Sequence, residues 1–219
     1  MLLTETRPAQ LSAAMREGSR VEHEEAESSA FMAELLDGRV NDLGYATYLA
    51  RYRGIYAALE DAVRGCDAPA IEAVYDVRLE RLATIEADLT YWRQRVSAPI
   101  EATSPATEAY IARLHEVAHD GGLLAAHHYT RYLGDLSGGQ AIGRILNRSF
   151  ELDGQGIAFY DFSAIAKPKI FKDGYRERLD ALELSGADQD RIVDEVRLAF
   201  RLNSDMFAEL GERLADFRR

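Results

Sequence analysis

The sequence is poor in several features on which other protein classes depend. Cys66 is its one cysteine, so the chain forms no internal disulfide and has no thiolate set for zinc or an iron–sulfur cluster. No run approaches the roughly 18 apolar residues of a membrane-spanning helix. The first ten residues are too polar for a signal peptide, and the last five carry no tail anchor. We therefore expect a soluble, cytoplasmic protein without a membrane anchor.

Basic residues are outnumbered by acidic ones. The 26 Lys and Arg against 37 Asp and Glu leave a formal net charge of −11, which argues against nucleic-acid binding. An anionic ligand would need a local basic patch. With 47% hydrophobic residues the chain can bury a sizeable core, and its length suits a single domain spanning residues 1–219, with a core of about 9–217.

Alternating β-branched runs are also missing, whereas Ala, Leu, Glu and Arg dominate. This composition predicts an all-α fold. Ser104 before Pro105, and Ser185 three residues before Asp188, predict helix starts. We expect breaks at residues 65–69, at 120–122 and around Gly154 and Gly156. The predicted helices cover about 8–30 with a further turn to Leu36, 41–64, 71–95 in two pieces, 105–119, 123–150, 162–184 with an interruption at Pro168, and 185–217.

The most informative segment is a glycine-rich stretch, residues 127–143, which is predicted to be helical. Each of its four glycines costs roughly 1 kcal/mol relative to alanine inside a helix, so the helix gives up stability for another purpose. One face, spanning an arc of about 140°, carries Arg131, Gly134, Asp135, Gly138, Gly139 and Ile142, with Gly143 one residue beyond. A flat ligand could lie against this bare backbone, and Gly138-Gly139 is a natural kink. Close helix–helix packing explains the glycines equally well, and spacing alone does not decide between the two.

Five histidines are available as metal ligands. Arg16, Arg20, His23 and Glu27 share an arc of about 60° on the first helix, but by composition alone His23 is a surface histidine. The spacing of Glu116 and His119 is that of a di-iron ligand pair, yet the sequence contains no second Glu-x-x-His to complete such a site. We expect the remaining histidines to be structural or exposed: His115, His119, His127 and His128.

Two segments resemble one known family. The run A-H-H-Y-T-R-Y-L-G-D-L-S-G-G-Q, residues 126–140, resembles the distal-helix signature of the heme oxygenases, and residues 23–32 are similar to their proximal helix. The resemblance extends from Leu11 to about Leu210 and is closest to the short bacterial members. It implies an all-α domain with heme b between a proximal helix and a kinked distal helix. It also implies cleavage of heme to biliverdin, CO and Fe²⁺, with the α regioisomer expected.

The resemblance assigns roles at the iron and on the distal side. His23 is the implied axial ligand of the heme iron, and Glu27 is expected to hydrogen-bond its other ring nitrogen. Glu22 departs from the family, which has an apolar residue before the ligand. Asp135 is expected to anchor a distal water network with Arg131 and Tyr56. The bare distal wall is assigned to Gly134, Gly138 and Gly139.

The resemblance also assigns residues to the rest of the heme. The propionates are expected to meet Arg16, Tyr129, Lys172 and Arg176. Pro168 and Gly174 depart from the family near this stretch. The implied pocket-lining residues of the last helix are Phe200, Asn203 and Phe207.

Electrons and O2 must come from outside the chain. No nucleotide-binding motif occurs in the sequence, so we expect a donor such as a ferredoxin or flavodoxin with its reductase, acting on a monomer. The surface on which this donor docks is predicted to be a basic patch of Arg16, Arg20, Lys167, Lys169, Lys172 and Arg176.

Two other functions fit less well. A heme carrier or sensor would keep His23 but would not need Asp135 and the glycines. A thiamine-salvage hydrolase on a similar fold would need a nucleophilic cysteine with paired carboxylates, and Cys66 has no histidine near it in sequence.

Overall fold

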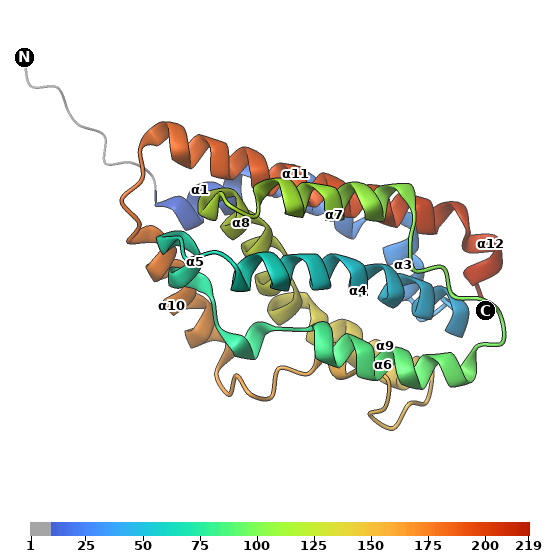
Figure 1. Ribbon diagram of the computed structural model, residues 1–219. Coiled ribbons are helices and arrows are strands. Elements are labelled where there is room, and N and C mark those ends of the chain that lie inside the picture. The colour runs from blue at the N-terminus through green and yellow to red at the C-terminus, as the bar shows by residue number, and fades with distance from the viewer. Residues whose placement is uncertain (1–9) are drawn as a thin grey trace, which may run out of the picture.

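The computed structural model describes residues 10–219, which form an assembly of helices joined by short loops (Figure 1). Within this range there is no β-strand, only an isolated bridge between Val40 and Arg218, so the all-α prediction is confirmed. No helix among these residues is both long and apolar enough to cross a membrane. The α-helices are α1 (Leu11–Gly18), α2 (Arg20–Glu27), α3 (Ala30–Leu36), α4 (Asp42–Arg64), α5 (Pro69–Val74), α6 (Leu82–Arg95), α7 (Pro105–Val117), α8 (Gly121–His128), α9 (Gln140–Ser149), α10 (Pro168–Asp180), α11 (Gly186–Glu212) and α12 (Leu214–Phe217). Short 3₁₀ turns lie at η1 (Val77–Leu79) and η4 (Ala158–Tyr160).

The predicted first helix over about 8–30 begins outside the described residues and is not continuous, because it is divided at Ser19 into α1 and α2. The further turn predicted to Leu36 is α3, which follows Ser28 and Ser29. At Ser19 the hydroxyl donates to the carbonyl of Met15 at 2.8 Å, and at Ser28 it donates to Glu25 at 3.2 Å. Such side-chain bonds offer the backbone an alternative to the helical ladder. Gly38 lies just beyond α3 with a φ of +70°, a left-handed conformation that favours glycine where a helix ends.

The predicted starts of three later helices are confirmed by their caps. Asn41, Ser104 and Ser185 each accept a hydrogen bond from a backbone N–H three residues on. These bonds satisfy amides that have no partner within the helix.

Three predicted boundaries are wrong. The predicted break at 120–122 exists but ends two residues early: Asp120 caps α8 by accepting from the Leu123 amide at 3.1 Å, so Gly121 and Gly122 already belong to that helix. Pro168 is the first residue of α10, and residues 162–167 are not helical; its fixed φ and missing N–H suit the first turn. The last predicted helix is interrupted at Arg213, between α11 and α12.

The glycine-rich segment forms one helical stretch from Gly121 to Ser149 that contains two π-helical turns. These are η2 (Tyr129–Leu133) and η3 (Asp135–Gly139), between α8 and α9. A π turn inserts a residue into the ladder and rotates the side chains that follow. The predicted local irregularity at Gly138-Gly139 is therefore part of a wider π-helical region.

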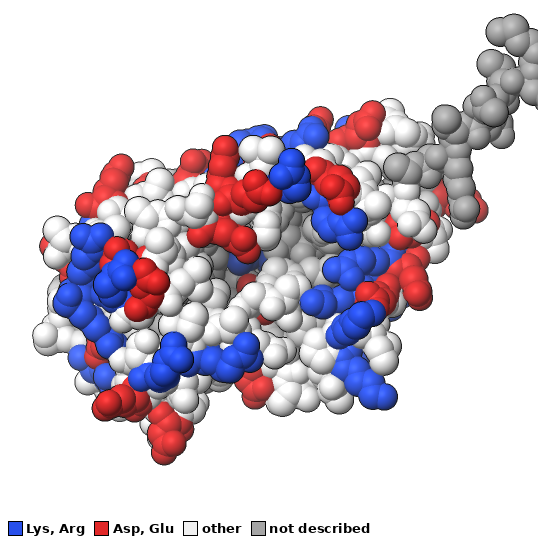
Figure 2. Space-filling model, turned by 180° about the vertical axis from the view of Figure 1, so that it is seen from behind, with Lys and Arg blue, Asp and Glu red and all other residues white. Residues whose placement is uncertain are grey.

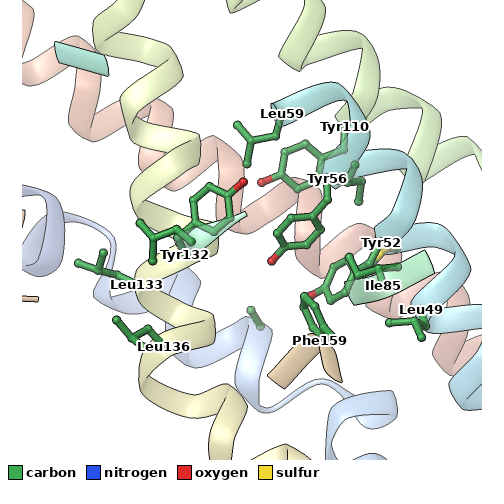
Figure 3. Packing of buried hydrophobic residues seen from close by; sticks show 14 of the residues in the cluster. Leu49, Tyr52, Tyr56, Leu59, Ile85, Tyr110, Tyr132, Leu133, Leu136 and Phe159 are labelled. Carbon is green, nitrogen blue, oxygen red and sulfur yellow. The ribbon is translucent and has the colours of Figure 1, made fainter. Parts of the chain in front are cut away.

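The core is rich in aromatic rings. Figure 3 shows Tyr52 and Tyr56 of α4 among Tyr110, Tyr132 and Phe159, which come from three other parts of the chain. All five rings are at most 2% exposed. Helix α4 therefore links the core to the glycine-rich stretch.

Candidate functional site

A cavity of about 680 Å³ lies between α2, α4, the two π turns and α11. It gathers predicted site residues that are far apart in the sequence: Arg16, His23, Glu27, Tyr129, Arg131, Gly134, Asp135, Gly138, Gly139, Arg176, Phe200, Asn203 and Phe207. Tyr56 and Lys172 are the two predicted residues that do not line it, and each contacts a residue that does. A second hollow, of about 760 Å³, lies between α9 and residues 157–168, and its described lining contains no histidine.

The α2 wall presents one imidazole. His23 has a side chain that is 48% exposed, and its Nε2 lies 3.4 Å from Oε1 of Glu27, one turn along. The ring meets Phe200 of α11 edge-on, with 5.3 Å between ring centroids. Glu22, the departure from the family, instead accepts a hydrogen bond from Arg201 at 3.3 Å and does not line the cavity. The imidazole therefore has one carboxylate partner and an open side.

The opposite wall shows that the four glycines serve two purposes. A Cβ atom added at Gly134 or Gly138 would meet nothing within 4 Å, so these two leave free space beside the backbone. A Cβ at Gly139 would lie 3.1 Å from the Tyr160 ring, and one at Gly143 would lie 2.9 Å from the Cβ of Tyr160. The ligand-face interpretation fits the first pair, and close packing fits the second.

A buried hydrogen-bond network stands behind this wall. From Arg131, Nη1 donates to Asn203 at 2.6 Å, Nη2 to Tyr52 at 3.1 Å and Nε to Tyr56 at 3.3 Å. Its Nη2 also lies 3.5 Å from Oδ1 of Asp135, while Tyr56 donates to Oδ2 of the same carboxylate. The Arg131 and Asp135 side chains are only 8% and 9% exposed. Tyr56 of α4 and Arg131 of η2 thus fix the carboxylate at the edge of the cavity, and Asn203 of α11 in turn fixes Arg131.

Burial sets the proton distribution in this network. It raises the pKa of Asp135 above its ordinary value, an effect opposed by Arg131 and by the Tyr56 hydrogen bond. Burial also raises the pKa of Tyr56 well above the usual range, so this hydroxyl stays protonated and donates a hydrogen bond to Asp135. The Asp135 carboxyl group therefore accepts hydrogen bonds from Tyr56 and Arg131.

Basic side chains border the cavity at one end. The face in Figure 2 is hollowed, with Lys and Arg side chains gathered on one side of the hollow. Arg16, Arg20 and Arg176 line the cavity together with Tyr129. Lys172 does not line the cavity, and it donates to Ser137 of the π turn η3 at 2.9 Å. This end suits the negatively charged edge of a flat ligand.

The other histidines lie outside the cavity. His127 pairs with Glu195 at 2.8 Å, and His128 with the Tyr175 hydroxyl at 2.8 Å; both are at most 1% exposed. His115 and His119 are exposed on α7 and at its end. Residues 10–219 contain no cluster of three or more His, Cys, Asp or Glu suited to a metal ion, so no di-iron site is found in them.

Several lining residues were not predicted. Tyr48 and Tyr52 precede Tyr56 by eight and four residues on α4, so the helical repeat would have placed them on the same face. Tyr160 lines the cavity from η4, and no local pattern in the sequence signals that position.

Comparison with known proteins gives a consistent result. The family model described as heme oxygenase matches residues 9–209. Heme oxygenase 1 of Homo sapiens is 39% identical over 212 residues, covering 94% of this chain and 74% of the human protein. Heme oxygenase 1 of Nostoc is 40% identical over 208 residues, covering 91% and 85% of the two chains.

Solved structures agree. Heme oxygenase-1 from the cyanobacterium Synechocystis, in complex with heme, is similar with a TM-score of 0.86 and 36% identity over 95% of each chain. The heme oxygenase from Leptospira interrogans has a TM-score of 0.85 and 33% identity, covering 91% of this chain and 99% of that one. The chain therefore belongs to the heme oxygenase family and is an enzyme that degrades heme.

Proposed function

We propose that heme lies in the cavity between α2 and the π turns, with His23 as the ligand of its iron. The supporting observation is that one cavity joins an accessible imidazole on one wall to a wall that Gly134 and Gly138 keep free of side chains. Glu27 lies 3.4 Å from one ring nitrogen of His23 and orients the imidazole, so that the other nitrogen is available to the iron. Arg16 and Arg176 hold the propionates at the basic end of the cavity. Tyr129, the first residue of η2, lines the same end.

Lys172 has a different proposed role from the other basic residues. Its ammonium group bonds to Ser137, next to Gly138, and so joins α10 to the distal wall. It positions the propionate end and the wall relative to each other. This link determines how far the heme can rotate within its plane, and hence which carbon bridge of the ring is opened.

Bound heme supplies both the iron at which O2 is activated and the ring that is opened, giving biliverdin, CO and Fe²⁺. Asp135 holds ordered water on the distal side, with Arg131 and Tyr56 fixing its carboxylate. A proton reaches the oxygen through this water, which is general-acid catalysis by a positioned solvent molecule. Gly134 and Gly138 keep side chains off this wall, which would leave room for oxygen beside the ring.

The electrons come from a separate donor, such as a ferredoxin or flavodoxin with its reductase, and the enzyme acts as a cytoplasmic monomer. Support for donor docking comes from the basic residues at the cavity edge of a chain whose net charge is −11. Attraction of an acidic donor to this edge is weakened by salt. Electron-transfer rates that do not change with ionic strength would contradict this docking site.

The test is to add heme, O2 and ascorbate to the purified protein, follow the heme absorption band and identify the bilin released. We expect wild-type protein to form an imidazole-ligated complex and to release biliverdin. His23→Ala should lose the imidazole-ligated spectrum while the ligand-free protein stays folded, because the His23 side chain is 48% exposed. Unchanged spectra in His23→Ala would disprove the ligand assignment. Stable heme binding without bilin in the wild type would identify a carrier instead.

A further inference from the structure

One carboxylate links the two helices that carry the basic end of the cavity. Asp180, the last residue of α10, accepts a hydrogen bond from the backbone N–H of Ser12 at 2.7 Å and another from the Ser12 hydroxyl at 2.9 Å. Ser12 lies in the first turn of α1 and is 8% exposed. The two residues are 168 positions apart in the chain, and their helices lie at the same end of the molecule (Figure 1). The carboxylate therefore caps a helix that belongs to a distant part of the sequence.

The first turn of α1 depends on this carboxylate. Gln10, which precedes the helix, makes no side-chain hydrogen bond to it. The N–H groups of a first helical turn have no partner within the helix, and a negative charge at this end is also favoured by the helix dipole. At the other end of α1, the carbonyl of Gly18 accepts a hydrogen bond from Arg197 of α11 at 2.6 Å. Helix α1 is thus held at its start by α10 and at its end by α11.

The helical repeat places two arginines of the cavity next to this link. Arg16 follows Ser12 by four residues and Arg176 precedes Asp180 by four, so each lies one turn from the link on the same face of its helix. Both arginines line the cavity. Burial raises the pKa of Tyr129, and the positive charges of Arg176 and Arg16 both oppose this increase. The two guanidinium groups therefore lie near one phenol, at the same end of the cavity.

The polar partners of each arginine lie on its own helix. The Arg16 side chain is 66% exposed and pairs with its neighbour Glu17 at 2.9 Å. Arg176 pairs at 3.2 Å with Asp173, also on α10. Among the side-chain hydrogen bonds and ion pairs of residues 10–219, only those between Ser12 and Asp180 join α1 to α10. The separation of the two guanidinium groups thus depends on this link and on apolar packing.

We propose that Asp180 is a positioning residue for heme cleavage: by joining α1 to α10 it sets the separation of Arg16 and Arg176, and hence the in-plane seating of the heme whose propionates they hold. This rests on heme occupying the cavity as proposed above. Rotation of the ring in its plane would bring a different carbon bridge to the distal wall. A free-energy difference of about 1.4 kcal/mol between two seatings changes their ratio about tenfold, so a small displacement of one arginine is sufficient to mix the products.

The test compares Asp180→Ala with the wild type by two measurements. Proton NMR of the heme–cyanide complex reports the seating without turnover, through the paramagnetically shifted signals of the heme methyl groups. The isomer composition of the released biliverdin reports which bridge is opened. We expect the methyl shifts to change in Asp180→Ala, and the ratio of minor to major isomer to rise about tenfold.

Asp180→Asn should restore the wild-type result in both measurements. Its amide oxygen can accept from the Ser12 N–H, while its NH₂ group donates to the Ser12 hydroxyl, which can reverse its role. Ser12→Ala loses the hydroxyl but keeps the N–H, so it should show a smaller change than Asp180→Ala. Urea unfolding of the ligand-free proteins checks that each variant is folded, and Ser12→Ala carries the same comparison if Asp180→Ala is not.

Asp161→Ala is the matched control. Asp161 accepts the same pair of bonds from Ser163, at 2.8 Å from the N–H and 3.2 Å from the hydroxyl, but within one loop. Its replacement should leave the methyl shifts and the isomer composition unchanged.

Heme titration separates the two proposals, because a wild type that forms no imidazole-ligated complex would contradict the cavity assignment and not the link. With that complex formed, a folded Asp180→Ala with wild-type methyl shifts and isomer composition would overturn the positioning role. Changes of equal size in Asp161→Ala would also overturn it. An Asp180→Asn variant that behaves like Asp180→Ala would overturn it in favour of an effect of charge.

Discussion

The two walls of the cavity are built in opposite ways. On the α2 wall, His23 is 48% exposed and Glu27 is 70% exposed, and the single contact between them is a 3.4 Å approach on the surface of a two-turn helix. On the distal wall, Arg131 and Asp135 are below 10% exposed and are held by Tyr52, Tyr56 and Asn203. In the proposed arrangement the α2 wall supplies the iron ligand, and the distal wall supplies a fixed electrostatic environment.

This difference indicates what each wall contributes to stability. An exposed side chain with one charged partner stabilises the fold by less than ~1 kcal/mol, so α2 residues are free to serve the ligand. A buried ion pair stabilises only as a complete set, because removing one partner leaves the other charged and desolvated. Substitutions on the two walls should therefore separate binding from folding.

The largest expected effect is that of Arg131→Met. It leaves the Asp135 carboxylate buried without its cation and removes the hydrogen bonds to Tyr52 and Asn203. We expect a loss of about 3–5 kcal/mol in the free energy of unfolding of the ligand-free protein, measured with urea. The matched change on the other wall is Arg20→Ala, which breaks an exposed pair with Glu24 and should cost less than ~1 kcal/mol. Equal losses would contradict the contrast between the walls.

Glu195 of α11 pairs with His127 of α8, the helix that leads into the distal wall, and this pair makes stability depend on pH. Burial raises its pKa, but hydrogen bonds from Arg113 and His127 more than reverse this and hold the pKa at about 2, against an ordinary 4.5. The unfolded chain therefore takes up the proton first, and stability falls as pH falls from about 4.5 toward 2.

Glu195→Gln removes this contribution, which is about 3 kcal/mol at neutral pH from the difference between the two pKa values. Its unfolding free energy should be lower at pH 7 and should vary less with pH between about 4.5 and 2. The check is a series of urea unfolding curves for both proteins across that range. If the free energy of unfolding fell equally with pH in the two proteins, Glu195 would not be the titrating group.

The glycine pairs provide the smallest effects and the sharpest division. Gly143→Ala places a Cβ 2.9 Å from that of Tyr160 and should destabilise the ligand-free protein by about 1–3 kcal/mol. Gly138→Ala meets nothing within 4 Å and should stabilise it by up to ~1 kcal/mol, while weakening heme binding because the methyl group enters the cavity. Thermal unfolding and heme titration of both variants make the comparison. A destabilised Gly138→Ala with normal heme affinity would reverse the assignment.

Local sequence signals predicted where helices lie better than how they are joined. Asn41, Ser104 and Ser185 marked true starts because a cap is a local interaction. The division of the first helix at Ser19 comes from the hydrogen bond of its hydroxyl to the Met15 carbonyl, and a serine in a helical pattern does not by itself indicate that bond. The two π turns interrupt a segment whose composition predicts an ordinary α-helix. Propensity does not contain that information.

The same limit applies to the site. The resemblance pointed to residues that the structure gathers around one cavity, including His23 and Asp135. Spacing alone left the glycines undecided, and the division between Gly138 and Gly143 required the position of Tyr160, which comes from another part of the chain. Lys172 was expected at the propionates, whereas its bond to Ser137 depends on how α10 lies against η3.

The most direct test of the division between the walls is the bilin yield per bound heme in Asp135→Ala. This variant keeps His23 and should bind heme with an imidazole-ligated spectrum and near-normal affinity, because Asp135 lies on the distal wall and is not the proposed iron ligand. It should release little biliverdin, and with hydrogen peroxide it should gain peroxidase activity toward phenols, since positioned water no longer favours attack on the ring over cleavage of the O–O bond; Asp135→Asn should retain part of the yield. A rate of heme degradation equal to wild type in Asp135→Ala would contradict the claim that the buried distal network directs the chemistry.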